Sequence, residues 1–178
     1  KRWPVPAIDR LFDHFSLKSL STENRVVMAP MTRNHSPDNI PGEASAAYYR
    51  RRAAGGVGLI ITEGTCPNHI AANGYPDVPY FHGEERLAGW KAIVDAVHAE
   101  GGSIVCQVMH VGRVASHLNK EVSAETVAPS AIKAEGEIFT EQGMKPLDTP
   151  RALLREEIPS VIDEYRRAAQ NAIDAGFD

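Results

Sequence analysis

The sequence is poor in cysteine, with only Cys66 and Cys106 among its 178 residues. Two cysteines this far apart form neither a disulfide framework nor a set of metal ligands, so we expect no metal site. Free cysteine usually behaves as a small buried hydrophobe. We therefore expect both thiols to pack in the interior of a reduced, cytoplasmic protein.

Long apolar runs and an excess of positive charge are also lacking. The strongest apolar run covers residues 57–61, whereas a membrane span needs about 18 apolar residues. Residues 1–6 contain no apolar segment of the kind found in signal peptides. The 19 Lys and Arg residues are outnumbered by 23 Asp and Glu residues, which gives a net charge of −4. We expect neither a membrane nor a nucleic acid as a partner.

The sequence does contain an alternation of strand-like and helix-like segments. Short apolar runs predict strands at 25–31, 57–63 and 103–109. Segments that end at glycine predict helices at 43–54, 84–100 and 156–175. Such alternation indicates an α/β protein whose parallel sheet is covered on both faces. Residues 21–24 predict a turn, and residues 126–150, which have no clear period, predict a long loop.

Two architectures fit this order of elements, a doubly wound sheet and a (β/α)8 TIM barrel. The glycine cluster at 55–58 follows a helix and precedes a strand. A dinucleotide fingerprint requires the opposite order, which favours the barrel. A complete barrel takes about 250 residues. The 178 residues therefore predict a single domain, 1–178, that forms the N-terminal part of a barrel and ends before its fourth strand.

Barrel sites lie at the carboxyl ends of the strands, so the residues just past each predicted strand are the candidates. They are Pro30, Met31, Thr32 and Arg33, then residues 62–65, then Gln107, Met109, His110, Gly112 and Arg113. This set is rich in amide, hydroxyl and small groups and poor in acid and base groups. It suits a flat cofactor that supplies the chemistry itself.

Three other polar features have ordinary explanations. Glu63 ends a predicted strand, and we expect a buried carboxylate hydrogen-bonded to a neighbouring loop rather than a catalytic base. His110 and His117 are poorly spaced as metal ligands and are expected to have structural or solvent roles. The arginines at 50–52 are expected to form a solvated helix face or an interface.

Four motifs carry a resemblance to a known family. They are residues 28–33 (MAPMTR), 62–65 (TEGT), 107–113 (QVMHVGR) and the segment 165–178. In this order and spacing they resemble the old yellow enzyme family, over nearly the whole chain. The resemblance implies a TIM barrel, of which this chain covers about three βα units and an N-terminal hairpin. It also implies non-covalent FMN, reduction by NADH or NADPH, and ping-pong transfer of hydride from flavin N5 to the β-carbon of an activated alkene. Some members also reduce nitro compounds and nitrate esters.

The resemblance also implies roles for individual residues. The backbone of Pro30, Met31 and Thr32 is expected to lie against the isoalloxazine ring. The Thr32 hydroxyl is expected to bond flavin O4 and tune its potential. Gly64 would allow close approach of the ring. The Gln107 amide would bind the pyrimidine edge, donating to one atom and accepting from another.

Around the substrate, the resemblance assigns Tyr75 to the pocket wall, and Met109 stands where the family usually has Trp. The family's substrate-anchoring pair and its proton-donating tyrosine lie beyond residue 178. One alternative is therefore a non-catalytic half-barrel that needs a complementary C-terminal fragment to bind FMN. A homo-oligomer and a flavin barrel with an added iron–sulfur domain also stay open.

Overall fold

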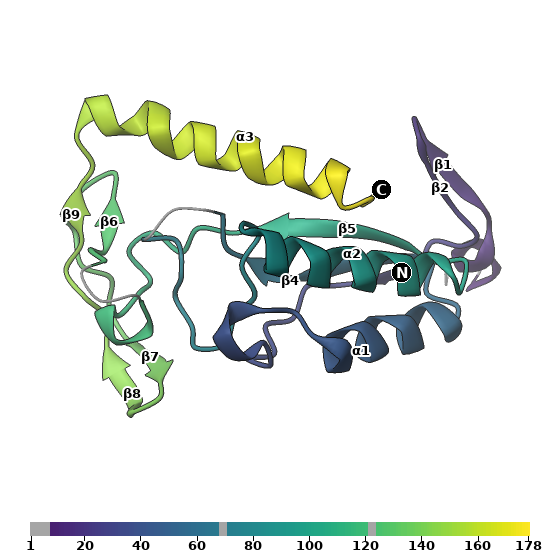
Figure 1. Ribbon diagram of the computed structural model, residues 1–178, viewed down its shortest axis with the longest axis horizontal. Coiled ribbons are helices and arrows are strands. Elements are labelled where there is room, and N and C mark those ends of the chain that lie inside the picture. The colour runs from purple at the N-terminus through teal and green to yellow at the C-terminus, as the bar shows by residue number, and fades with distance from the viewer. Residues whose placement is uncertain (1–7, 68–70, 121–123) are drawn as a thin grey trace, which may run out of the picture.

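A three-stranded parallel sheet organises the chain in a computed structural model that describes residues 8–67, 71–120 and 124–178. The strands lie in the order β3 (Val27–Met28), β4 (Leu59–Thr65) and β5 (Ser103–Val108). They are followed along the chain by α1 (Glu43–Ala54), α2 (Glu84–His98) and α3 (Ile158–Asp174), respectively. Figure 1 shows the helices arranged along the sheet. These are the three βα units that the sequence predicts.

The core lies between the sheet and the helices. Met28, Ile60 and Ile104 are register partners across the three strands, and all three are buried. They pack in one cluster with Trp90 and Val97 of α2. Because side chains alternate along a strand, this row gives the sheet one closed apolar face.

The opposite face of the sheet is less covered than the sequence predicts. Val27 begins the neighbouring row, and 50% of its surface is exposed. The predicted strand at 25–31 is also too long, because only Val27 and Met28 are paired with β4. Before them, the Asn24 side chain accepts the Val26 N–H. After them, Pro30 has no N–H to give to a ladder.

The helices match their predicted positions closely, and two glycines allow α2 and its following turn to approach the α1 region. A methyl group on Gly89 would overlap the carbonyl oxygen of Pro41, just before α1. One on Gly102 would lie 2.7 Å from the Ala53 methyl group. At the end of α3, Phe177 packs against Phe81 and Trp90.

The N-terminal hairpin is present, formed by β1 (Phe15–Leu17) and β2 (Leu20–Thr22) after the short 3-10 helix η1 (Ile8–Phe12). Ser21 and Thr22, which the sequence assigns to a turn, lie in β2. The hairpin lies at the end of the sheet where the strands begin (Figure 1).

The prediction of an irregular loop at 126–150 is wrong. This segment contains β6 (Val127–Ala128) and an antiparallel hairpin of β7 (Glu137–Thr140) and β8 (Gly143–Pro146). β6 pairs with β9 (Arg151–Ala152). The two ribbons lie beyond the carboxyl ends of the main strands (Figure 1). Short 3-10 helices η2 (Pro37–Asn39), η3 (His117–Asn119) and η4 (Arg155–Glu157) complete the described structure.

Both cysteines are free and serve as packing residues, as expected. Cys66 belongs to a second buried cluster with Ala72, Val78 and Tyr80, and Cys106 packs against the main core. Burial raises the pKa of each thiol to about 12. None of the helices in the described part of the chain is long and apolar enough to cross a membrane.

Candidate functional site

Three of the predicted site residues meet at the carboxyl ends of β4 and β5. Gly64 is the register partner of Gln107, past a shift in register that follows Ile61. A methyl group on Gly64 would overlap the terminal methyl of Met109 and lie 2.7 Å from its Sδ atom. The same position is 3.3 Å from the Gln107 side-chain oxygen. In this structure the missing side chain of Gly64 therefore makes room for Met109.

Gln107 is anchored through its backbone, and its side-chain oxygen lies beside Gly64. Its N–H donates to the Thr62 hydroxyl at 3.0 Å, and that hydroxyl donates to the Glu63 carbonyl at 2.9 Å. No residue within the described ranges hydrogen-bonds the Gln107 side-chain amide. The two N–H donors of the amide and its carbonyl oxygen are therefore left for a ligand at this edge of the sheet.

The segment after β3 carries the other predicted flavin contacts. Pro30 is half-buried, whereas Met31 and Thr32 are exposed. The Thr32 hydroxyl has no hydrogen-bond partner in the described part of the chain. Its neighbour Arg33 turns inward and links the segment to β4.

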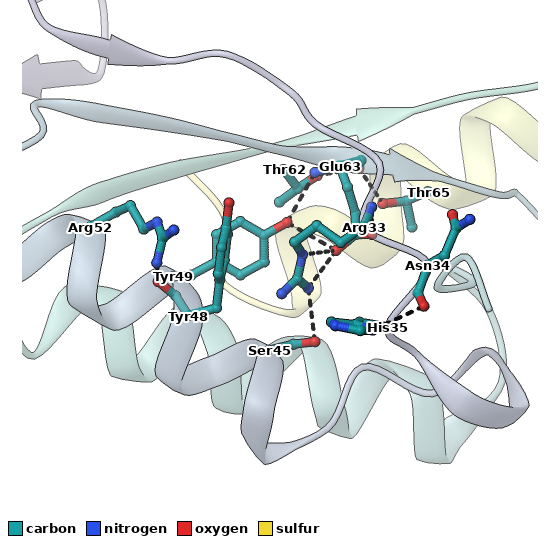
Figure 2. Close-up of polar contacts among 10 residues, drawn as sticks. All are labelled: Arg33, Asn34, His35, Ser45, Tyr48, Tyr49, Arg52, Thr62, Glu63 and Thr65. Atoms are coloured by element: carbon teal, nitrogen blue, oxygen red, sulfur yellow. Dashed lines mark hydrogen bonds and ion pairs between the residues drawn. The ribbon is translucent and has the colours of Figure 1, made fainter.

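Arg33 forms an ion pair with Glu63, the residue directly before Gly64 (Figure 2). The Glu63 side chain is 0% exposed and that of Arg33 is 12% exposed. The Arg33 Nε atom donates to Oε1 of Glu63 at 2.8 Å, and the Arg33 backbone N–H donates to Oε2 at 3.3 Å. The Arg33 Nη2 atom also donates to the Ser45 hydroxyl at 2.9 Å. The expectation that Glu63 is a buried carboxylate bonded to a neighbouring loop is confirmed.

Tyr49 of α1 holds the same carboxylate from the other side. Its hydroxyl donates to Oε1 of Glu63 at 3.2 Å and accepts the Glu63 N–H at 3.0 Å. Burial and the nearby Glu63 charge raise the pKa of Tyr49, so the hydroxyl stays protonated. Figure 2 shows the Arg33 guanidinium among Glu63, Ser45 and the two tyrosine rings. It lies 4.3 Å from the centre of the Tyr48 ring.

Tyr75 has a different environment from the residues above. It packs against the second buried cluster, and its backbone N–H donates to the Asn73 side chain at 3.2 Å. Nearby, Val111 lies against Gly74 and donates its N–H to the carbonyl of Ala72. The structure therefore ties the Tyr75 loop to the segment after β5.

The remaining polar candidates have partners within the protein. His117 lies 3.0 Å from Asp148, and His110 accepts the N–H of Gly112. Arg50 pairs with Glu100, and the Arg52 guanidinium lies over the Tyr48 ring. The described residues contain no group of three or more His, Cys, Asp or Glu side chains placed to hold a metal ion.

Sequence reasoning missed the ion pair and the role of Tyr49. A signal for the pair was present, because Arg33 and Glu63 follow neighbouring parallel strands and carry opposite charges. Carboxyl ends of such strands meet at one edge of the sheet. No comparable signal identifies Tyr49, since its hydroxyl reaches Glu63 only through the packing of α1 on the sheet.

The sequence model of the NADH:flavin oxidoreductase / NADH oxidase family matches residues 10–178. 12-Oxophytodienoate reductase 7 of Oryza sativa subsp. japonica is 40% identical over 171 residues, which cover 94% of this chain and 43% of that protein. 12-Oxophytodienoate reductase 1 of the same organism is 39% identical over 168 residues, with the same coverage of each chain.

Solved structures give the same result. Morphinone reductase aligns with a TM-score of 0.88 and 46% identity, over 94% of this chain and 46% of that one. The old yellow enzyme homologue from Zymomonas mobilis aligns with a TM-score of 0.88 and 39% identity, with the same coverage. The chain thus spans a little under half the length of these relatives, and its three βα units are part of their TIM barrel. It belongs to the NADH:flavin oxidoreductase / NADH oxidase family.

Proposed function

We propose that the protein containing this chain is an FMN-dependent oxidoreductase that uses NADH or NADPH to reduce the double bond of an activated alkene. The observation that carries the proposal is the Gln107 amide, which is unpartnered among the described residues and lies beside Gly64. The exposed Thr32 hydroxyl follows the neighbouring strand. Membership of the family supports the binding of a flavin and the use of a nicotinamide as reductant.

The residues present fit an isoalloxazine ring. The Gln107 amide offers a donor and an acceptor to the ring's pyrimidine edge, and Thr32 offers a hydroxyl. The backbone of Pro30, Met31 and Thr32 would lie against the ring. When bound, FMN supplies hydride transfer between the nicotinamide and the β-carbon of the substrate. Met109 has to turn away from Gly64 if the ring is to approach that backbone.

Within this chain, Tyr75 and Met109 are proposed as residues of the substrate pocket. An unbranched thioether in place of the family's usual indole makes the wall softer and more adaptable. The proposed substrates are small enones and enals, with nitro compounds and nitrate esters as further candidates. A solved morphinone reductase structure contains tetrahydroNAD, which supports a nicotinamide as reductant. The substrate-anchoring pair and the proton donor would come from outside this chain.

The visible absorption spectrum of the purified whole protein, before and after denaturation, tests the cofactor. We expect flavin bands that move into the supernatant when the protein is denatured. Anaerobic NADH or NADPH should bleach these bands, and 2-cyclohexenone should restore them. A Gln107→Leu variant should bind FMN more weakly than the parent. A colourless protein that takes up no added FMN would overturn the proposal.

A second candidate is a half-barrel module that binds FMN only with a complementary C-terminal fragment. The observation that favours it is an exposed apolar stripe on α3, where Ile162 is 63% and Ile173 is 69% exposed. Such a stripe marks a surface for association. Residues 1–178 should then bind FMN only when co-expressed with the remaining half of a family barrel. Light scattering would distinguish that complex from a homo-oligomer of the chain alone.

A further inference from the structure

We infer that Glu63 is a positioning residue, whose buried carboxylate holds the segment after β3 so that the Thr32 hydroxyl stands at a fixed place relative to Gly64. This inference rests on the proposed function, because it assigns Thr32 and Gly64 to the flavin. The role follows from the geometry around one carboxylate, because the Glu63 side chain is 0% exposed and its oxygens bond Arg33 and Tyr49.

The segment after β3 has little else to hold its backbone. Pairing with β4 ends at Met28. From residue 31 to residue 35, the N–H of Arg33 is the one main-chain donor with an acceptor in the described part of the chain, and that acceptor is Oε2 of Glu63. The next backbone anchor is at Ser36, whose N–H donates to the carbonyl of Asp77 at 3.0 Å.

The carboxylate is itself fixed on several sides. Oε1 of Glu63 accepts from the Arg33 guanidinium and from the Tyr49 hydroxyl. The Tyr49 hydroxyl also accepts the Glu63 N–H, which ties backbone and side chain to α1. Arg33 reaches α1 as well, through the buried Ser45 hydroxyl. Charge-assisted hydrogen bonds in a buried site are short, directional and stronger than neutral ones.

The bonds from Arg33 to Glu63, here called the clamp, lie next to the proposed flavin contacts. Thr32 directly precedes Arg33, and Gly64 directly follows Glu63. One ion pair between Arg33 and Glu63 therefore sets the spacing between the two strand ends. A flat ring that touches both ends would be sensitive to that spacing. An ion pair with only a structural role would affect stability and leave the electronic properties of the flavin unchanged.

Glu63→Gln is the direct test, made in the whole protein. The amide keeps the shape of the side chain but offers a single acceptor oxygen. That oxygen cannot accept from both the guanidinium and the Arg33 backbone N–H in their present positions, so one bond is lost. Asp95→Asn is the matched control. Asp95 pairs with Lys91 on the exposed surface of α2, and both side chains are 60% exposed.

Three measurements follow for each variant: hydrogen exchange of the Arg33 amide, the FMN dissociation constant and the flavin reduction potential. In Glu63→Gln we expect faster exchange of the Arg33 amide, with α2 unchanged. The dissociation constant should rise about tenfold, which corresponds to the entropy of re-ordering one backbone residue on binding. The reduction potential should shift, whereas Asp95→Asn should change none of the three.

A double-mutant cycle shows whether Glu63 acts through Thr32. We expect Thr32→Ala to shift the potential, and Glu63→Gln to add nothing further in that background. Additive shifts, or an unchanged potential in Glu63→Gln, would overturn the inference. If Glu63→Gln does not fold, Tyr49→Phe takes its place, because it removes one bond to the carboxylate and retains the charge.

The exchange measurement separates this inference from the proposed function, because it needs no flavin. A protein that binds no FMN but shows faster exchange of the Arg33 amide in Glu63→Gln refutes the proposed function and leaves the role of Glu63 in place. Unchanged exchange in a variant that still binds FMN refutes the clamp alone.

Discussion

Replacing Gly64 with alanine tests the contact between this glycine and Met109. The new methyl group would overlap the end of the Met109 side chain. Moving a side chain out of its rotamer well costs about 0.5–1.5 kcal/mol. Alanine is favoured over glycine in a strand by about 0.5–1 kcal/mol, because less backbone entropy is lost on folding. These terms nearly cancel, so the free energy of unfolding should stay within about 1 kcal/mol of the parent value.

Gly89→Ala is the matched comparison, because its methyl group also meets an atom at too short a distance. Here the atom is the carbonyl oxygen of Pro41, with the Pro41 ring 3.2 Å away. Alanine in a helix gains about 1 kcal/mol over glycine. Overpacking against a backbone that cannot rotate away costs about 1–3 kcal/mol. We expect a net loss of about 1 kcal/mol, opposite in sign to the usual effect of this substitution in a helix.

Urea unfolding followed by circular dichroism measures both variants, and quenching of FMN fluorescence measures binding by Gly64→Ala. The added methyl group would stand where the ring has to approach the backbone of Gly64, so the FMN dissociation constant should rise about tenfold, which corresponds to about 1.4 kcal/mol. Met109→Ala in the same protein should leave binding weak, because the methyl group on the backbone remains. Equal destabilisation by the two glycine substitutions, or FMN binding by Gly64→Ala that equals the parent's, would refute the reasoning.

Three further predictions concern stability and titration. Burial alone would raise the pKa of Asp148, but hydrogen bonds from His117 and Thr126 outweigh it and lower the pKa. Asp148→Asn should therefore lower the free energy of unfolding by about 1.5 kcal/mol at pH 7. This difference from the parent should shrink and vanish as the pH falls below 3.8, because Asp148 itself then becomes protonated. Urea titrations at several pH values measure it. Cys66 and Cys106 should resist iodoacetamide at pH 8 until the protein unfolds. Because their folded pKa values are raised from 9.0 to about 12, stability should fall as the pH rises above 9. Trp90→Ala should lower the free energy of unfolding by about 3–5 kcal/mol, because it leaves a cavity at the centre of the core. Calorimetry measures this loss.

Periodicity predicted the main elements because each has one face buried in a single core. α1 was predicted with its observed bounds, and β4 and β5 within two residues. Strand 25–31 was predicted too long because its apolar pattern continues past the residues that pair. The hairpin of β7 and β8 was missed for a different reason. Its turn residues, Glu141 and Gln142, lack the Asn-Gly or Gly-containing pair that identifies a two-residue hairpin turn.

The candidate site was predictable where it depends on the ends of parallel strands. Gly64 and Gln107 are neighbours because they end adjacent strands, and Met109 follows on the second. The Arg33 and Glu63 contact follows from the same rule once the charges are noticed. The packing of Tyr49 against Glu63 depends on the rotation of α1, which the sequence pattern does not specify. The flavin and substrate roles of these residues stay predictions.

The helix-facing core and the proposed pocket use different residues, and this bears on how such a protein diversifies. Met28, Ile60 and Ile104 belong to the closed core, whereas Met109 lies outside it, against the bare backbone of Gly64. Substitutions at position 109 should therefore change the free energy of unfolding little. Variants at this position can acquire new substrate preferences without first acquiring stabilising mutations elsewhere. Position 109 is accordingly the place to begin a saturation library for directed evolution.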